Sequence, residues 1–431
     1  MDNDESLNSP EASVEAESTT DMMSGEDVDA APTISSENEK PKGKKKPLII
    51  VIVLLLIIGI GVGVFLMISN NNSNNEPEET ADGVVEEEKE EIVEEPEEEE
   101  EEKVAKTALL PMGQMLRKKL SEASGAKYND FRNEFEEEKH IVAIKRAKEL
   151  PEKRQSRDYD ITDSDSEAPI YLWYEETDAA KKTGTIYFYS EAETIYADSN
   201  MRNAFGSMVK LSDISGLAEI DVSKVENMDY LFFEDKKIKT LDALEGWNTS
   251  NLTEMSGTFV DANVVDISGL AGWDVSHVKK MSDLFRGNEQ ITDISALKKW
   301  DTAQVESLDG VFSGCTKLAD ISPLSDWNTS KNTLTSSMFE GMPLLKNISA
   351  LKNWDMSNVY HASGMFSDDS SLEDLSPIAN WNMKKLEYAY GMFQNTGVSD
   401  ATVLDSWNVS SLKDDGKEDM FDGGVKTPKW Y

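Results

Sequence analysis

One copy of a recurring pattern in this chain reads Val265-Asp-Ile-Ser-Gly-Leu270, then Trp273-Asp-Val-Ser-His-Val278, then Met281-Ser-Asp-Leu-Phe285. Counted from the tryptophans, a β-branched residue or leucine mostly follows at position 5, a phenylalanine at 12 and, as in this copy, a methionine in some turns at 8. The tryptophans recur every 26 or 27 residues. A fixed period in this range is typical of a repeat protein in which one turn stacks on the next.

Two aromatic series repeat in register, and we interpret them as the structural ladder of the repeats. The tryptophans are Trp247, Trp273, Trp300, Trp327, Trp354, Trp381 and Trp407. The phenylalanines are Phe259, Phe285, Phe312, Phe339, Phe366 and Phe393, with Phe232 and Phe421 at the ends. The apolar positions do not keep helical spacing for long. Short strands joined by tight turns are therefore expected, with like side chains stacked inside and turns about 4.8 Å apart.

The predicted fold is a repeat solenoid over residues 205–431, mainly β with short helical or 3-10 turns and about eight turns long. Residues 104–204 are predicted to form a helical lead-in and a β-ribbon cap. Apolar positions from 107 to 155 favour two helices, and the runs 170–174 and 185–189 favour the ribbon. The ribbon is expected to cover the open end of the first turn.

Three blocks of different composition precede the lead-in. The chain has a formal net charge of -40, and residues 1–47 are polar, acidic and nearly free of aromatics, which predicts a disordered tail. Residues 48–68 contain no charge. As a helix they would span about 31 Å, which predicts a single transmembrane helix rather than a cleaved signal peptide. Residues 69–103 are dense in glutamate, which predicts an extended acidic spacer.

The flanks of residues 48–68 predict an orientation. Lysines between positions 40 and 46 precede this segment and an acidic stretch follows it, and cationic flanks stay in the cytoplasm. The expected location is the plasma membrane, crossed once, with a cytoplasmic N-terminus and an extracellular C-terminal domain.

The repeat resembles the BspA-like leucine-rich-repeat surface protein family of bacteria. Two steps carry the resemblance, Trp273-Asp-Val-Ser with Met281-x-x-x-Phe285, and Phe312-Ser-Gly-Cys-Thr-Lys-Leu318. Residues 147–196 resemble the lead-in of that family, so the similarity covers residues 140–425. It implies an irregular right-handed leucine-rich-repeat solenoid on a bacterial surface, with a role in adhesion or host interaction.

Residue types that carry most enzyme chemistry are sparse. The histidines His140, His277 and His361 have no cysteine or carboxylate at metal-ligand spacing, and we interpret the last two as surface substitutions. The single cysteine, Cys315, is interpreted as a packed thiol. The sequence therefore predicts no catalytic residue, no cofactor and no metal site, and the protein is not expected to be an enzyme.

Aspartates recur once per turn, at Asp266, Asp293, Asp320 and Asp374. We interpret them as corner residues whose side chains bond nearby N–H groups, rather than as the acid pair of a glycoside hydrolase. Calcium binding by this acidic edge stays open. The chain has no basic stripe, so nucleic acid is not an expected partner.

Three turns depart from the pattern. Ile220 stands where a tryptophan is expected, and Asn332 stands at an apolar position and predicts a local bulge. In the last turn Phe421 comes two positions late, after Asp414 and Asp415. Weak first and last turns are expected where a stack must end without aggregating.

The leading hypothesis is a membrane-anchored bacterial cell-surface repeat protein that binds a protein or glycan on another cell. Such binding would serve adhesion or an interaction with a host or neighbouring cell. Exposed lysines, such as Lys279, Lys280, Lys298 and Lys299, are candidate contacts. The alternatives are a structural component of the envelope or cell wall and, more remotely, a surface hydrolase.

Overall fold

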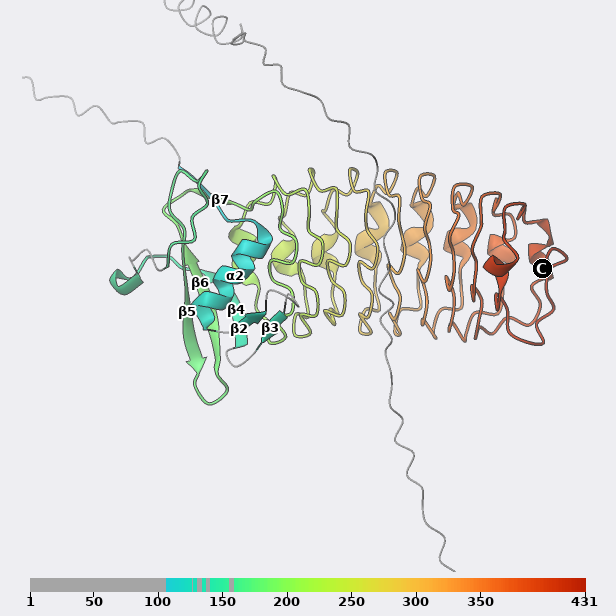
Figure 1. The fold of residues 1–431 in the computed structure, drawn as a ribbon, viewed down its shortest axis with the longest axis horizontal. Helices are drawn as coiled ribbons and strands as arrows, with labels where there is room; N and C mark the ends of the chain where they lie inside the picture. The colour runs from blue at the N-terminus through green and yellow to red at the C-terminus, as the bar shows by residue number, and fades with distance from the viewer. Residues whose placement is uncertain (1–105, 126, 130–133, 137–139, 155–158) are drawn as a thin grey trace, which may run out of the picture. The chain divides into compact units, whose positions relative to one another are not determined.

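The repeats form a row of turns stacked side by side in a computed structural model (Figure 1). The structure describes residues 106–431 except residues 126, 130–133, 137–139 and 155–158. In the turns, the regular element is a short 3-10 helix, one per copy of the repeat. These helices are η3 (Ser215–Glu219), η4 (Asp242–Leu244), η5 (Ser268–Leu270), η6 (Ser295–Lys299), η7 (Ser322–Asp326), η8 (Ser349–Asn353), η9 (Ser376–Ile378) and η10 (Thr402–Ser406).

In most of these turns an aspartate stands two residues before or at the start of the 3-10 helix. The Oδ1 atom of Asp266 accepts the N–H of Ser268 at 2.8 Å, two residues further along the chain. Asp293, Asp320 and Asp374 make the same bond to the serine two residues on, at 2.7 to 2.8 Å. The interpretation of these aspartates as corner residues is confirmed, because each one satisfies a backbone donor where the chain turns.

Neighbouring turns are joined by single parallel bridges. One column of bridges, named here the bridge column, runs through Asn200, Asn227, Glu254, Lys280, Ser307, Leu334, His361 and Tyr388. Within the described residues 205–431 no longer strand forms, so the prediction of a mainly β solenoid is wrong. The backbone explains the difference: Asp283 and Gly287, with φ of 55° and 74°, show two left-handed positions in one turn. Left-handed residues interrupt extended pairing after a few positions.

The aromatic ladder occupies the interior of the stack. Phe259 and Phe285 are fully buried with ring centroids 5.7 Å apart, and Phe339 and Phe366 lie 5.6 Å apart. Asn332 is also buried, and its N–H donates to the carbonyl of the residue three positions back, as the valines at this place in other turns do. The predicted bulge at Asn332 is therefore wrong, because the backbone hydrogen bond does not depend on the side chain.

The lead-in is built from small sheets and one helix. The main sheet has the order β4-β6-β5, with β5 (Tyr171–Asp178) antiparallel to β6 (Thr183–Tyr189) and β4 (His140–Arg146) parallel to β6. The helix is α2 (Gly113–Ser124). The remaining elements are β1 (Thr107–Leu109) paired with β7 (Thr194–Tyr196), β2 (Lys127–Asn129) paired with β3 (Glu134–Glu136), and the 3-10 helices η1 (Glu152–Arg154) and η11 (Asp415–Lys417), the last in the final turn.

The predicted lead-in needs correction. Two helices were expected between positions 107 and 155, but α2 is the one α-helix in the described part of that range, and β4 occupies residues 140–146. Ile141, Val142 and Ile144 explain the strand, because β-branched side chains favour extended backbone. The expected ribbon exists as β5 and β6, but it belongs to a three-stranded sheet.

The N-terminal predictions lie outside the described residues. These are the tail 1–47, the transmembrane helix 48–68 and the acidic spacer 69–103. Within residues 106–431, as far as they are described, no helix has the length and apolar character needed to cross a membrane. The predicted fold class is thus corrected to a stack of 3-10 turns joined by isolated bridges and preceded by small sheets.

The lead-in continues directly into the stack. Strand β4 bridges to the first turn at Ala143 and Asp213, and β7 bridges to it at Tyr196 and Asp221. The N–H of Ile144 donates to the Asp213 carbonyl at 2.9 Å. Two strands of the lead-in therefore act as the first rungs, and their junction with the repeats leaves a recess.

Candidate functional site

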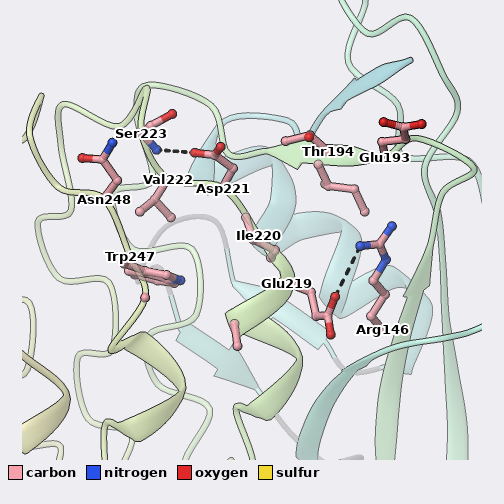
Figure 2. Close-up of a pocket in the computed structure, with 13 residues that line it drawn as sticks. Arg146, Glu193, Thr194, Glu219, Ile220, Asp221, Val222, Ser223, Trp247 and Asn248 are labelled. Carbon is pink, nitrogen blue, oxygen red and sulfur yellow. Dashed lines mark hydrogen bonds and ion pairs between the residues drawn. The ribbon is translucent and has the colours of Figure 1, made fainter. Parts of the chain in front are cut away.

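A pocket of about 440 Å³ lies where the lead-in meets the first turn (Figure 2). Its walls include Arg146 from β4, Thr194 from β7, Glu219 from η3 and Trp247 from the following turn. Ile220 also lines it, at the place that a tryptophan takes in later turns. The column of indoles therefore begins at Trp247, and the smaller isoleucine leaves room for the pocket.

The polar groups of this pocket hold its walls together. Arg146 forms an ion pair with Glu219 at 3.4 Å and donates to the carbonyl of Ala192 at 3.1 Å. The Oδ1 atom of Asp221 accepts the N–H of Ser223 at 2.8 Å. These contacts make a recess of mixed charge.

The second candidate is an exposed surface along the bridge column, named here the bridge face. It consists of the column residues and their exposed neighbours one position before and two positions after. Its middle is polar, as in the ion pair of Lys280 with Glu254 at 2.7 Å. Its C-terminal end carries Tyr360, His361, Tyr388 and Tyr390 and is aromatic. The character of this face thus changes along the stack.

The rings at the C-terminal end form a connected cluster. The ring of His361 stacks on Tyr388 with centroids 5.2 Å apart, and Tyr360 meets His361 edge-on at 6.4 Å. The ammonium of Lys413 lies 4.3 Å from the centre of the Tyr388 ring and 2.8 Å from the Glu387 carboxylate. The hydrogen bond to Glu387, and after it the hydrogen bond that Lys413 donates to the Tyr388 hydroxyl at 2.5 Å, raise the pKa of Lys413.

The predicted tryptophan ladder lies in the interior of the stack. Trp327 and Trp354 stack with centroids 6.4 Å apart and nearly parallel planes, and both are almost fully buried. Each indole N–H donates to a main-chain carbonyl in the preceding turn. The pairs are Trp247 with Leu217, Trp273 with Leu244, Trp300 with Leu270, Trp327 with Leu297, Trp354 with Leu324, Trp381 with Leu351 and Trp407 with Ile378.

The four lysines proposed as contacts belong to two different columns. Lys280 lies in the bridge column with Lys279 next to it, and both are exposed. Lys298 and Lys299 close η6. The structure therefore does not join them into one basic patch.

The remaining candidate side chains are the cysteine and the histidines, and those that the structure describes pack against or bond to neighbours in the repeats. The thiol of Cys315 is buried and lies 3.4 Å from the carbonyl of Phe285, and burial raises its pKa to about 12. This confirms the interpretation of a packed thiol. His277 is near Ser276, and the Nδ1 atom of His361 lies 2.6 Å from the hydroxyl of Ser336. The side chain of His140 lies outside the described part.

Two buried carboxyls occupy the same place in the repeat as Cys315. The Oδ1 atom of Asp235 accepts the N–H of Met208 at 2.6 Å, and that of Asp369 accepts the N–H of Met342 at 2.7 Å. Burial raises the pKa of Asp369 to about 9 and that of Asp235 well above its usual range. Burial therefore favours the neutral form of both carboxyls, and they act as parts of the core.

Sequence reasoning missed two features of the stack. Trp430 is an eighth rung: its ring stacks on Trp407 at 6.0 Å, and its N–H donates to the Leu404 carbonyl at 2.8 Å. It comes 23 residues after Trp407, outside the expected period. The aromatic cluster was also missed, although Tyr360 and Tyr390 stand 6 and 9 positions after their tryptophans, where other turns carry polar residues.

Comparison with known proteins identifies the repeats. A family model described as "Mycoplasma protein of unknown function, DUF285" matches residues 199–320, 263–348 and 320–429, more than half of the chain when taken together. No curated protein and no solved structure matches the chain. The likeness to BspA-like leucine-rich repeats is not confirmed by these findings. The overlapping matches follow the repeats, and the chain belongs to the DUF285 family of repeat proteins, whose function is unknown.

Proposed function

We propose that this chain is a surface repeat protein that binds a macromolecular partner through its bridge face. The observation that carries the proposal is the aromatic cluster at the C-terminal end of that face. Tyr360 and Tyr390 are 40% and 48% exposed, among the most exposed large apolar side chains of the described residues. Tyrosine is enriched at protein interfaces because it offers a large, rigid contact area with a polar end.

The form of the surface favours a large partner. The bridge column repeats over eight residues, which at about 4.8 Å per turn extends it over about 34 Å. The pocket at Ile220 supports small-molecule binding less well, because its arginine, Arg146, already pairs with Glu219. An extended face suits contact with another protein or a glycan chain.

We propose further that the repeats are presented outside the cell. The lysines before position 48 and the acidic residues after position 76 support this orientation. Protease shaving of intact cells tests it. Release of fragments from residues 106–431 without lysis supports presentation outside, and full protection of those residues until lysis contradicts it.

The binding proposal is tested with the full chain and live cells of a host or neighbouring species. The measurement is the amount of labelled protein bound as its concentration increases. Saturable binding that weakens when Tyr360 and Tyr390 are both replaced by alanine supports the proposal. A matched control replaces Leu344 and Val403, which are exposed apolar residues outside the cluster. Absence of saturable binding to every cell type, together with an envelope defect on deletion, would favour a structural role instead.

A further inference from the structure

Several tyrosines of this chain already hold a cation of the same chain over their rings. The ammonium of Lys224 lies 3.7 Å from the centre of the Tyr196 ring, and the guanidinium of Arg202 lies 5.0 Å from that of Tyr230. Lys413 covers Tyr388 in the same way at 4.3 Å. Each contact is a cation–π interaction, in which the negative face of the ring attracts the positive charge.

A carboxylate completes two of these three sites. Arg202 pairs with Asp229 at 2.8 Å while it lies over Tyr230, and Lys413 pairs with Glu387 at 2.8 Å while it lies over Tyr388. Asp229 directly precedes its tyrosine in the sequence, and Glu387 directly precedes Tyr388. The turns therefore contain a recurring unit that holds a cation between an aromatic ring and an acid.

Tyr360 and Tyr390 present rings without such a cation, and the residues directly before them, Val359 and Ala389, are not acidic. Within the part of the chain that the structure describes, no lysine or arginine lies over either ring. Tyr360 still contacts His361 at its edge, but both tyrosines are more exposed than any other tyrosine described. Their free ring faces are available to a cation from outside the chain.

The last turn brings acidic residues next to the stretch that carries Tyr390. This longer turn contains η11, and it bonds to that stretch through the N–H of Gly391, which donates to the carbonyl of Glu418 at 3.2 Å. An acidic loop therefore borders Tyr390 on the side of the chain end. Its exposed carboxylates are those of Asp414, Asp415, Glu418 and Asp419.

We propose that Tyr360 and Tyr390 receive arginine or lysine side chains from an extended basic segment of a partner protein. The acidic loop supplies the opposite charge. The inference rests on the proposed function, because it names the chemistry of the partner that the bridge face binds. Charge complementarity favours a basic protein over a neutral glycan, since the acidic loop of the last turn borders the stretch that carries Tyr390 and the chain has a formal net charge of -40.

The test uses the full chain and a fluorescent peptide of arginine residues as the probe, with anisotropy measured at physiological salt. Because the chain is acidic overall, some attraction is unspecific, so the decisive comparison keeps the charge constant. Tyr360→Ala with Tyr390→Ala should weaken binding by at least about fivefold. Tyr360→Phe with Tyr390→Phe should stay within about twofold of wild type, because phenylalanine keeps the ring face.

The control pair Leu344→Ala with Val403→Ala should bind as wild type, and circular dichroism should show that all variants keep the same fold. Equal binding by wild type and the alanine pair would overturn the proposal. So would binding of a neutral glucan hexasaccharide that depends on both tyrosines while the arginine peptide does not depend on them. Asp415→Asn with Glu418→Gln should weaken peptide binding. The salt dependence of peptide binding should not become steeper in this variant.

The two proposals fail in different ways. If the alanine pair loses cell binding but the arginine peptide binds wild type and the alanine pair equally well, the basic-segment inference is wrong and the proposed function stands. If peptide binding depends on both tyrosines but the protein binds no cell surface, the rings do receive basic side chains and the proposed surface function is wrong.

Discussion

The indole N–H of Trp327 donates a hydrogen bond to the main-chain carbonyl of Leu297, 3.2 Å away in the preceding turn. Trp300 and Trp354 make the equivalent bond in the neighbouring turns, at 3.2 and 3.1 Å. The carbonyl lies in a 3-10 helix whose leucine is fully buried, so water does not reach it easily. A buried carbonyl needs a donor, which explains why the repeat uses tryptophan rather than phenylalanine at this place.

Trp327→Phe should therefore lower the free energy of unfolding by about 1 to 3 kcal/mol, because the Leu297 carbonyl loses its donor and the ring becomes smaller. Urea unfolding followed by circular dichroism measures this change. Trp430→Phe is the matched control at the end of the stack, where the indole is only partly buried. Its cost should be clearly smaller, and an equal cost at both places would contradict the role given to the buried N–H.

Asp369 predicts a pH dependence of stability. Burial, together with the charges of the nearby Asp368 and Glu340, raises its pKa to about 9 in the fold. In the unfolded chain an aspartate has a pKa of about 3.9. Between these values the folded chain holds a proton that the unfolded chain releases, so stability falls as pH rises from about 4 to 9. Urea midpoints measured across this range check the sign.

A matched exchange isolates this effect. Asn288 occupies the same place in another turn, where its Oδ1 accepts the N–H of Val264 and its Nδ2 donates to the Phe259 carbonyl. Asp369→Asn should stabilise the fold at pH 8, on the order of 1 to 3 kcal/mol, and Asn288→Asp should destabilise it there. No change in the pH profile with either variant would show that Asp369 is ionised in the fold.

Asn332 should be a weak point of the stack. It is fully buried, its Nδ2 donates to the Leu334 carbonyl at 3.3 Å, and its Oδ1 has no hydrogen-bond partner among the described residues. Val305 and Val359 hold the same place in the flanking turns. Asn332→Val should raise the thermal midpoint and stabilise by about 1 to 2 kcal/mol. Val359→Asn should have the opposite effect, and a loss of stability with Asn332→Val would show that the amide has a partner.

Cys315 should resist thiol reagents in the folded protein. Its thiol is buried and burial raises its pKa to about 12, so almost no thiolate exists at pH 8. Mass spectrometry after a short treatment with iodoacetamide should find no adduct in native protein and complete reaction in urea. Rapid labelling of the native chain would place this sulfur at the surface.

The architecture of the repeats was predictable in its period but not in its local structure. The spacing of Trp and Phe is visible directly, and the corner role of Asp266 follows from residue type. Whether a turn contains strands or 3-10 helices depends on φ at positions such as Asp283, which is left-handed although glycine occupies that place in other turns. Aspartate can adopt this left-handed conformation, but its presence in a sequence does not indicate it. The strand β4 was mistaken for helix because short apolar runs have no clear period.

The candidate surface was harder to predict. A sequence does not tell which polar positions share a face, so Lys280 and Lys298 were grouped although they lie in different columns. Tyr360 and Tyr390 become notable only when the turns are superposed, because they fall at different positions after their tryptophans. Their possible role depends on which residues lie beside them in the next turn, and only the structure shows these neighbours.

Blocking the bridge face tests the central claim most directly. Single cysteines at Ser363, between the two open tyrosines in the sequence, or at Lys352 in η8 can carry a bulky polymer, since Cys315 is buried. The measurement is binding of each full-length conjugate to the responding cells. The account predicts that polymer at position 363 abolishes saturable binding while polymer at position 352 leaves it unchanged. Unchanged binding with the polymer at position 363 would contradict it.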